Sequence, residues 1–217
     1  MRHGQARFGA ADYDLLSPLG ERQAVETGVY FARTGMRFDE VQIGPKWRHW
    51  ATATAALSQM RDAPAPTTKP QLDEFAEAPE ILQAAQEMVG LSPQEMSALP
   101  KSAQLRHYAA LIEAWMRGRV RLEGRPEATS FRAVVAGWLR ELAGRPGRGQ
   151  RLLVVTSAGV IAAAIVEVLE LPVGRMSDFT SVLRNASLTE IAFTVGRVSV
   201  LSFNSVAHLP PALTTGI

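Results

Sequence analysis

The hydrophobic positions in the first third of the chain predict a helix, a strand and a second helix. Ser17, followed by proline, is a typical helix N-cap, and Gly35 is a typical stop, so the apolar residues at helical spacing between them predict a helix. Residues 38–43 alternate apolar and polar side chains and predict a strand. After a glycine-proline turn, residues 47–60 return to helical spacing. Arg48 therefore lies just beyond a strand end, where open α/β sheets place ligand-binding groups.

Prolines interrupt the middle of the chain. Residues 62–70 are rich in proline and threonine, which predicts a loop or a short extended segment. Over 76–122, prolines separate short helical patterns from a longer one in which Leu105 and Met116 share the buried side. We interpret this region as an all-helical insertion over the sheet.

Strand and helix alternate through the last third of the chain. The predicted elements there are a helix containing residues 131–142, a strand over 151–156, a helix that ends before Pro172, and two strands over 187–194 and 197–203. This alternation predicts an α/β fold in which a mostly parallel sheet is sandwiched by helices, a three-layer α/β/α arrangement.

Composition and charge limit what this fold does. With 217 residues, of which 47% are hydrophobic and 20% charged, the chain suits one globular domain over 1–217. The formal net charge is +2 and no basic run occurs, so nucleic acid is not the expected partner. Cysteine is absent, which excludes disulfides and cysteine nucleophiles. The longest apolar run, 158–166, is too short to span a bilayer, and we expect a cytoplasmic protein without a membrane partner.

The first residues, Arg2, His3 and Gly4, form a compact pattern for handling phosphate. An imidazole can attack phosphorus, a guanidinium can bind two phosphoryl oxygens at once, and a glycine lets the backbone pass close to another group. Three residues prove little alone. The pattern gains weight only from matching motifs downstream.

Such motifs occur in order along the chain. With them, the chain resembles the histidine phosphatase (phosphoglycerate mutase-like) superfamily. The residues that carry the resemblance are Arg2-His3-Gly4-Gln5, Leu19 to Ala24, Pro45 with Arg48 and Thr52-Ala53, Leu72 with Glu74, and Val154-Val155-Thr156 with Gly159-Val160-Ile161. The resemblance covers essentially the whole chain and implies the superfamily's fold, with the helical insertion over the active site.

The resemblance also implies roles for individual residues. His3 would attack phosphorus and become a phosphohistidine that water hydrolyses, while Arg2 and Arg48 would bind the equatorial phosphoryl oxygens. Glu74 matches the proton donor to the leaving alcohol, although without the other motifs a solvated loop carboxylate would be the favoured interpretation. Its nearby substitutes are Asp73 and Glu77. The ligand would be a small phosphorylated substrate or inorganic phosphate.

Ser157 departs from the superfamily pattern, because it stands where the resemblance implies a second histidine. A serine hydroxyl can donate one neutral hydrogen bond to a phosphoryl oxygen, but it cannot carry positive charge. We therefore expect the loss of a charge-assisted bond of about 1.5–3 kcal/mol, or roughly a hundred- to thousandfold in rate. Ser157 could also cap the following helix, and both roles could hold together.

The chain also starts without the apolar strand that precedes the arginine-histidine-glycine unit in the superfamily. Our hypothesis is that the sequence begins inside the natural reading frame, with Met1 at the end of that strand. A native mass that matches 217 residues would contradict it. Without a central strand, the neighbouring strands would carry unpaired backbone groups, each costing about 1–3 kcal/mol if buried.

No zinc motif, P-loop or dinucleotide fingerprint occurs, and we expect no metal ion or other cofactor. His49 and His107 lie on predicted helices without a ligand partner four residues away, so we interpret both as surface or structural residues. For His208, after the last strand, we expect a local structural bond.

These features predict a metal-independent phosphomonoester hydrolase of reduced activity. One alternative is a phosphoryl-ligand-binding pseudoenzyme that retains Arg2, His3 and Arg48 but has lost turnover. A phosphoglycerate-type mutase is less favoured, because it must protect a phosphorylated intermediate from water. Specificity should lie in the insertion, and neither the substrate nor the oligomeric state follows from the sequence.

Overall fold

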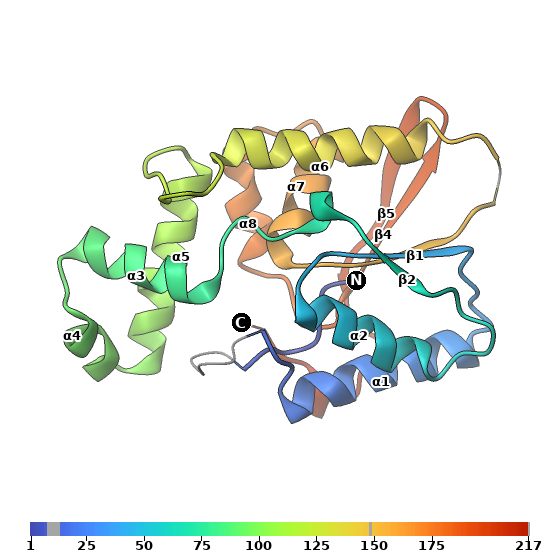
Figure 1. Cartoon of the computed structure of the whole chain (residues 1–217), viewed down its shortest axis with the longest axis horizontal. Coiled ribbons are helices and arrows are strands. Elements are labelled where there is room, and N and C mark those ends of the chain that lie inside the picture. Colours follow the sequence, from blue (N-terminus) through green and yellow to red (C-terminus); the bar gives the residue numbers. More distant parts are fainter. Residues whose placement is uncertain (8–13, 148, 217) are drawn as a thin grey trace.

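A parallel sheet forms the centre of the molecule (Figure 1). The computed structural model describes residues 1–7, 14–147 and 149–216. In that part of the chain, three strands pair in parallel in the order β2-β1-β3, namely β2 (Pro66–Thr68), β1 (Glu40–Ile43) and β3 (Leu152–Val155). Because the strands are parallel, their carboxyl ends meet at one edge of the sheet, where ligand sites form in such folds.

Helices cover both faces of this sheet (Figure 1). On one face lie α1 (Pro18–Arg33) and α2 (Trp47–Leu57), which pack against each other. On the other lie α6 (Ala128–Ala143) and α7 (Ala158–Val168). The three-layer α/β/α arrangement predicted from the sequence is therefore confirmed. No helix in the described ranges is both long enough and apolar enough to cross a membrane.

Alternating strand residues divide the core between the two faces. Val41 and Leu153 belong to a buried cluster with side chains of α1 and α2, whereas Leu152 and Val154 pack against the cluster beneath α6 and α7. Successive side chains of a strand point to opposite faces, so the Leu-Leu-Val-Val run of β3 supplies both clusters at once. This double burial explains why the run is continuously apolar.

Three helices occupy the insertion at 76–122 and project to one side of the sandwich (Figure 1). These are α3 (Ala78–Val89), α4 (Pro93–Ala98) and α5 (Lys101–Met116). The prolines begin helices here rather than break them, because a proline in the first turn loses no hydrogen bond. Capping boxes close the amino ends of α3 and α4.

The carboxyl-terminal part contains an antiparallel hairpin. Strands β4 (Leu188–Thr194) and β5 (Arg197–Ser205) are joined by a tight turn in which Gly196 has a φ of +74°. The remaining elements in the described ranges are the short helices η1 (Pro70–Leu72), η2 (Val173–Arg175), α8 (Met176–Thr180) and η3 (Pro211–Leu213).

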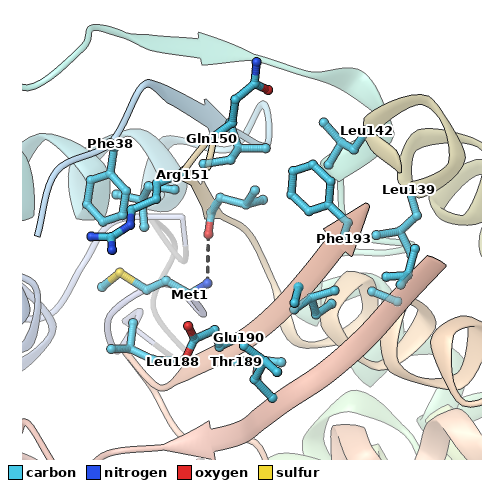
Figure 2. A pocket seen from close by; sticks show the side chains of 18 of the residues that line it. Met1, Phe38, Leu139, Leu142, Gln150, Arg151, Leu188, Thr189, Glu190 and Phe193 are labelled. Carbon is cyan, nitrogen blue, oxygen red and sulfur yellow. Dashed lines mark hydrogen bonds between the residues drawn. The ribbon is translucent and has the colours of Figure 1, made fainter. Parts of the chain in front are cut away.

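The amino-terminal residues lie between β3 and the start of β4. The N–H of Arg2 donates to the carbonyl of Ser187 at 3.0 Å, and the N–H of Thr156 donates to the carbonyl of Met1 at 3.1 Å. The Met1 amino group donates to the carbonyl of Val154 at 2.8 Å (Figure 2). Burial lowers the pKa of this amino group to about 5, because a charge is costly away from water.

A groove continues from Met1 between β3 and β4 (Figure 2). Its volume is about 1160 Å³, and its largely apolar lining includes Leu139 and Leu142 of α6 together with side chains of α1, α7, the two strands and β5. Met1 and Arg2 already bridge the two strands at one end of this groove. An extended segment continuing in line with them would pair with both strand edges.

An apolar extension of about five residues in front of Met1 should therefore raise the melting temperature. It would bury its side chains in the groove, pair the strand edges and place the terminal amino group in solvent, where it can be charged. A gain of a few kcal/mol corresponds to roughly 5–10 °C for a domain of this size. Thermal unfolding by circular dichroism measures the shift. A glycine-serine extension of equal length is the control, and equal melting temperatures for the two extensions would contradict the prediction.

Candidate active site

His3 lies beside the carboxyl end of β3. Its backbone N–H donates to the carbonyl of Thr156 at 3.0 Å, and its ring is buried. Nδ1 lies 2.7 Å from the carbonyl oxygen of Gly4 and must be the donor, because a carbonyl only accepts. Burial, then the nearby Arg48 and Arg2, hold the pKa of His3 well below its usual value. His3 is therefore a neutral imidazole with its Nε2 lone pair available for attack on an electrophile.

Two buried guanidinium groups flank His3. Arg2 donates through Nη1 to the carbonyl of Leu183, which anchors its side chain. Arg48, in the first turn of α2, is 2% exposed and donates through Nη1 to Asp14 Oδ1 at 2.8 Å and to Glu77 Oε2 at 3.1 Å. These carboxylates compensate the buried charge. An incoming anion would meet the two guanidinium groups at the imidazole.

Ser157 is turned toward α2 rather than toward its own helix. It occupies the N-cap position of α7, but its side chain makes no capping hydrogen bond. Its Oγ lies 2.7 Å from His49 Nε2 and 3.4 Å from Arg48 Nη2. The helix-capping role considered from the sequence is therefore not observed.

The structure corrects the surface alternative for His49, whereas the structural alternative agrees with its burial and its hydrogen bond. Its side chain is completely buried, with Nε2 against Ser157 and the ring centroid 5.7 Å from that of His3. Gly44 makes room for it, because a Cβ at that position would collide with His49 Nδ1. The helical spacing carried a signal for this burial, since His49 precedes the buried Ala53 by four residues.

Glu74 follows η1 and approaches the amino end of α7. One carboxylate oxygen accepts from the N–H of Gly159 at 3.1 Å, and the other accepts from the N–H of Phe75 at 3.1 Å. Burial raises the pKa of Glu74 to about 6, while these two N–H groups and the charge of Arg48 act in the opposite direction. A Cβ at position 159 would collide with the Glu74 carboxylate, so the glycine lets this carboxylate approach the amino end of α7. With this pKa, Glu74 can hold or release a proton near neutral pH.

The two substitutes considered for Glu74 are engaged elsewhere. Glu77 bridges Arg48 and Lys46, with an oxygen 2.7 Å from Lys46 Nζ. Asp73 lies 3.4 Å from the same ammonium group. Arg48 and then Lys46 hold the pKa of Glu77 below its usual value, against the effect of burial. Glu77 is therefore ionised near neutral pH and is a poor proton donor.

His208 lies outside this cluster. Its Nε2 lies 3.1 Å from Thr27 Oγ1 of α1, which agrees with the structural bond expected for it, but the partner is 181 positions away and not local. The sequence-predicted residues Arg2, His3, Arg48 and Ser157 are brought together, and Glu74 joins them through α7. Asp14 and His49 complete the cluster and were not predicted from the sequence.

A family model described as the histidine phosphatase superfamily (branch 1) matches residues 1–206. Among solved structures, the chain is similar to a phosphoserine phosphatase from Entamoeba histolytica in complex with 3-phosphoglyceric acid, at 20% identity, a TM-score of 0.67 and 96% coverage of both chains. It is also similar to the alpha-ribazole phosphatase of Shigella flexneri, at 19% identity, a TM-score of 0.65 and 94% coverage of both.

A third similar structure is a phosphoglycerate mutase from Bacillus anthracis, at 18% identity and a TM-score of 0.65, with coverage of 95% of this chain and 92% of the mutase. At such identities these likenesses show the fold alone. No curated protein sequence matches the chain.

Proposed function

Because the chain belongs to the histidine phosphatase superfamily (branch 1), we propose that it hydrolyses phosphate monoesters through a phosphohistidine formed on His3. The observation that carries the proposal is the state of the imidazole. It is buried and neutral, held at Nδ1 by the Gly4 carbonyl, and flanked by Arg2 and Arg48. Such a group is prepared to attack an anion that the two guanidinium groups bind.

The proposed reaction has two steps. In the first, the Nε2 lone pair of His3 forms a bond to phosphorus, the ester P–O bond breaks, and Glu74 gives its proton to the departing oxygen. In the second step, water attacks the phosphorus of the phosphohistidine and passes a proton to the Glu74 carboxylate. The P–N bond breaks, phosphate is released, and His3 and Glu74 return to their starting forms. Arg2 and Arg48 stabilise the charge on the phosphoryl oxygens throughout, and no metal ion is needed for that purpose.

Small phosphorylated molecules are the proposed ligands. The structurally similar phosphoserine phosphatase was solved with 3-phosphoglyceric acid, a small phosphate monoester. The helices at 76–122 contribute Glu77, at the N-cap of α3, to the partners of Arg48. We therefore propose that the insertion determines which ester is accepted.

Ligand binding without turnover is the second candidate function. It is favoured by the carboxylates of Asp14 and Glu77 on Arg48, because a substrate anion must compete with both for the guanidinium. Release of phosphate from p-nitrophenyl phosphate separates the two functions. Hydrolysis that depends on His3 supports the phosphatase. Saturable binding of a phosphate analogue without any such hydrolysis supports the binding protein.

Glu74→Gln should remove a pH dependence from the reaction. Glu74 must be protonated to act as an acid, so kcat/KM should fall as the pH rises through about 6. The variant should lose this alkaline limb and lose roughly 10²–10⁴-fold in rate on an alkyl phosphate. With p-nitrophenyl phosphate the loss should be smaller, because that leaving group departs without a proton.

Steady-state pH profiles on both esters measure the Glu74 effect. The control is Glu87→Gln, an exposed carboxylate on α3. Equal losses on the two esters, or an unchanged alkaline limb in Glu74→Gln, would exclude Glu74 as the proton donor.

A further inference from the structure

His49 and Ser157 form a buried hydrogen-bonded pair inside the candidate active site. The two atoms in contact, Nε2 and Oγ, are 2.7 Å apart, and both side chains are inaccessible to solvent. The pair is separated by 108 positions in the sequence and links α2 to the amino end of α7. Since Ser157 makes no helix-capping bond, the local structure of α7 does not explain the pair.

The hydrogen bonds around Ser157 assign its proton. Arg48 can only donate, so Ser157 Oγ accepts from Arg48 Nη2 and its own proton remains for another acceptor. The Nε2 atom of a neutral His49 is that acceptor. Burial, and then the charge of Arg48, hold the pKa of His49 well below its usual value, so the imidazole is neutral near pH 7.

We propose that His49 is a positioning residue for phosphoryl binding, which directs the Ser157 hydroxyl at the bound anion and supplies positive charge behind it. The inference rests on the phosphatase function proposed for the same site. When a dianion binds beside His3 and Arg48, its charge favours the imidazolium form of His49. Nε2–H then donates to Ser157 Oγ, and the serine O–H turns to a phosphoryl oxygen. The proton comes from an acid in the solvent, such as protonated buffer, whose bond to it breaks as the N–H bond of His49 forms. No other covalent bond changes.

This arrangement changes the loss of activity expected from having a serine at position 157. A serine alone offers a neutral hydrogen bond, whereas a serine that accepts from an imidazolium offers a polarised donor with a cation next to it. The pair therefore recovers part of the roughly hundred- to thousandfold loss expected for the serine. His49 acts through Ser157, and its contribution belongs to anion binding.

Other ionisable groups also respond when an anion binds. Those around the pair are Arg48 on α2, Lys46 at the N-cap of α2, Arg2 and His3 from the amino-terminal segment, Glu74 and Glu77 from the segment after η1, and Asp14. Because His3 and Glu74 can also change protonation, the test must compare variants rather than rely on the wild-type value alone.

Calorimetry with tungstate tests the proposal without requiring turnover. Tungstate is a tetrahedral dianion that itself carries no proton near pH 7, and titrations in two buffers of different ionisation enthalpy give the number of protons taken up. His49→Gln should take up about one proton fewer than the wild type. It should also bind tungstate roughly ten- to hundredfold more weakly, the loss of one charge-assisted bond. Proton uptake and affinity equal to the wild type would overturn the proposal.

Two further comparisons guard against a purely structural effect. Ser157→Ala should also weaken binding, and adding His49→Gln to it should cost little more, because the two residues act as a unit. Full additivity of the two losses would contradict the pair. His107→Gln, a histidine on α5, is the matched control and should leave both binding and proton uptake unchanged.

If His49→Gln folds poorly, a double variant that moves the histidine to position 157 tests the proposal instead. Because Ser157 Oγ touches the His49 ring, removing that ring makes space for an imidazole at 157. The double change Ser157→His with His49→Ala should bind tungstate at least as tightly as the wild type and more tightly than His49→Ala alone. No rescue by the second change would overturn the proposal. Absence of ester hydrolysis in a wild type that passes these binding tests would refute the phosphatase function only.

Discussion

Replacing His3 by alanine should lower kcat/KM for p-nitrophenyl phosphate by about a thousandfold or more, the scale seen when a nucleophile is removed. The reason is that the neighbouring imidazole, His49, has its Nε2 engaged with Ser157 and is not placed to replace the Nε2 lone pair of His3. The backbone N–H of His3 donates to the carbonyl of Thr156, and this bond remains in the alanine variant. The variant loses the ring and its contact with the Gly4 carbonyl, so we expect the rest of the site to keep its shape. Initial rates of p-nitrophenol release measure the loss.

The matched control for this substitution is His107→Ala, a histidine on α5 that makes no contact with His3. It should retain wild-type activity, and thermal unfolding should show both variants folded. Hydrolysis by His3→Ala at the rate of the control would reject the nucleophile assignment.

Replacing Arg48 by lysine should cost roughly 10²–10³-fold in kcat/KM, although the charge is kept. A guanidinium can donate in several directions at once, and Arg48 uses this capacity to hold Asp14, Glu77 and Ser157 while it faces the anion. An ammonium has a single nitrogen and cannot keep these contacts together. We expect the loss to include weaker binding, visible as a raised KM and a raised Kd for tungstate.

The control for Arg48→Lys is Arg33→Lys, an exposed arginine in the last turn of α1. Melting temperatures show whether the carboxylates around position 48 remain satisfied in the variant. Catalysis and tungstate affinity that match those of Arg33→Lys would contradict a role for the guanidinium in binding phosphate.

The fold could be predicted from the sequence because its signals are local. Ser17 starts α1 and caps it through its side chain, and the Leu-Leu-Val-Val run of β3 identifies a strand with apolar side chains packed on both faces. Boundaries were less certain, since helix α2 ends at Leu57 rather than at 60. For the short strand β2, the sequence did not distinguish a loop from an extended segment. The strand forms by pairing with β1, which lies more than 20 positions earlier in the chain.

Site residues that come directly after a predicted strand, such as Arg48, could be predicted from the sequence. It was not predictable where function depends on contacts between segments far apart in the chain. The hydrogen bond from Ser157 to His49 spans 108 positions, and the ion pair of Asp14 with Arg48 spans 34. Neither partner forms a motif with its neighbours in sequence. The helical phase of His49 was the available sign that it turns inward.

The most direct test of the account is to identify the phosphorylated residue during turnover. The protein is mixed with an aryl phosphate, quenched in base to preserve phosphohistidine, digested and analysed by mass spectrometry. The account predicts a single phosphoryl group on His3, stable in base and lost in acid. A phosphoryl group on another side chain, or none while the protein is turning over, would contradict it.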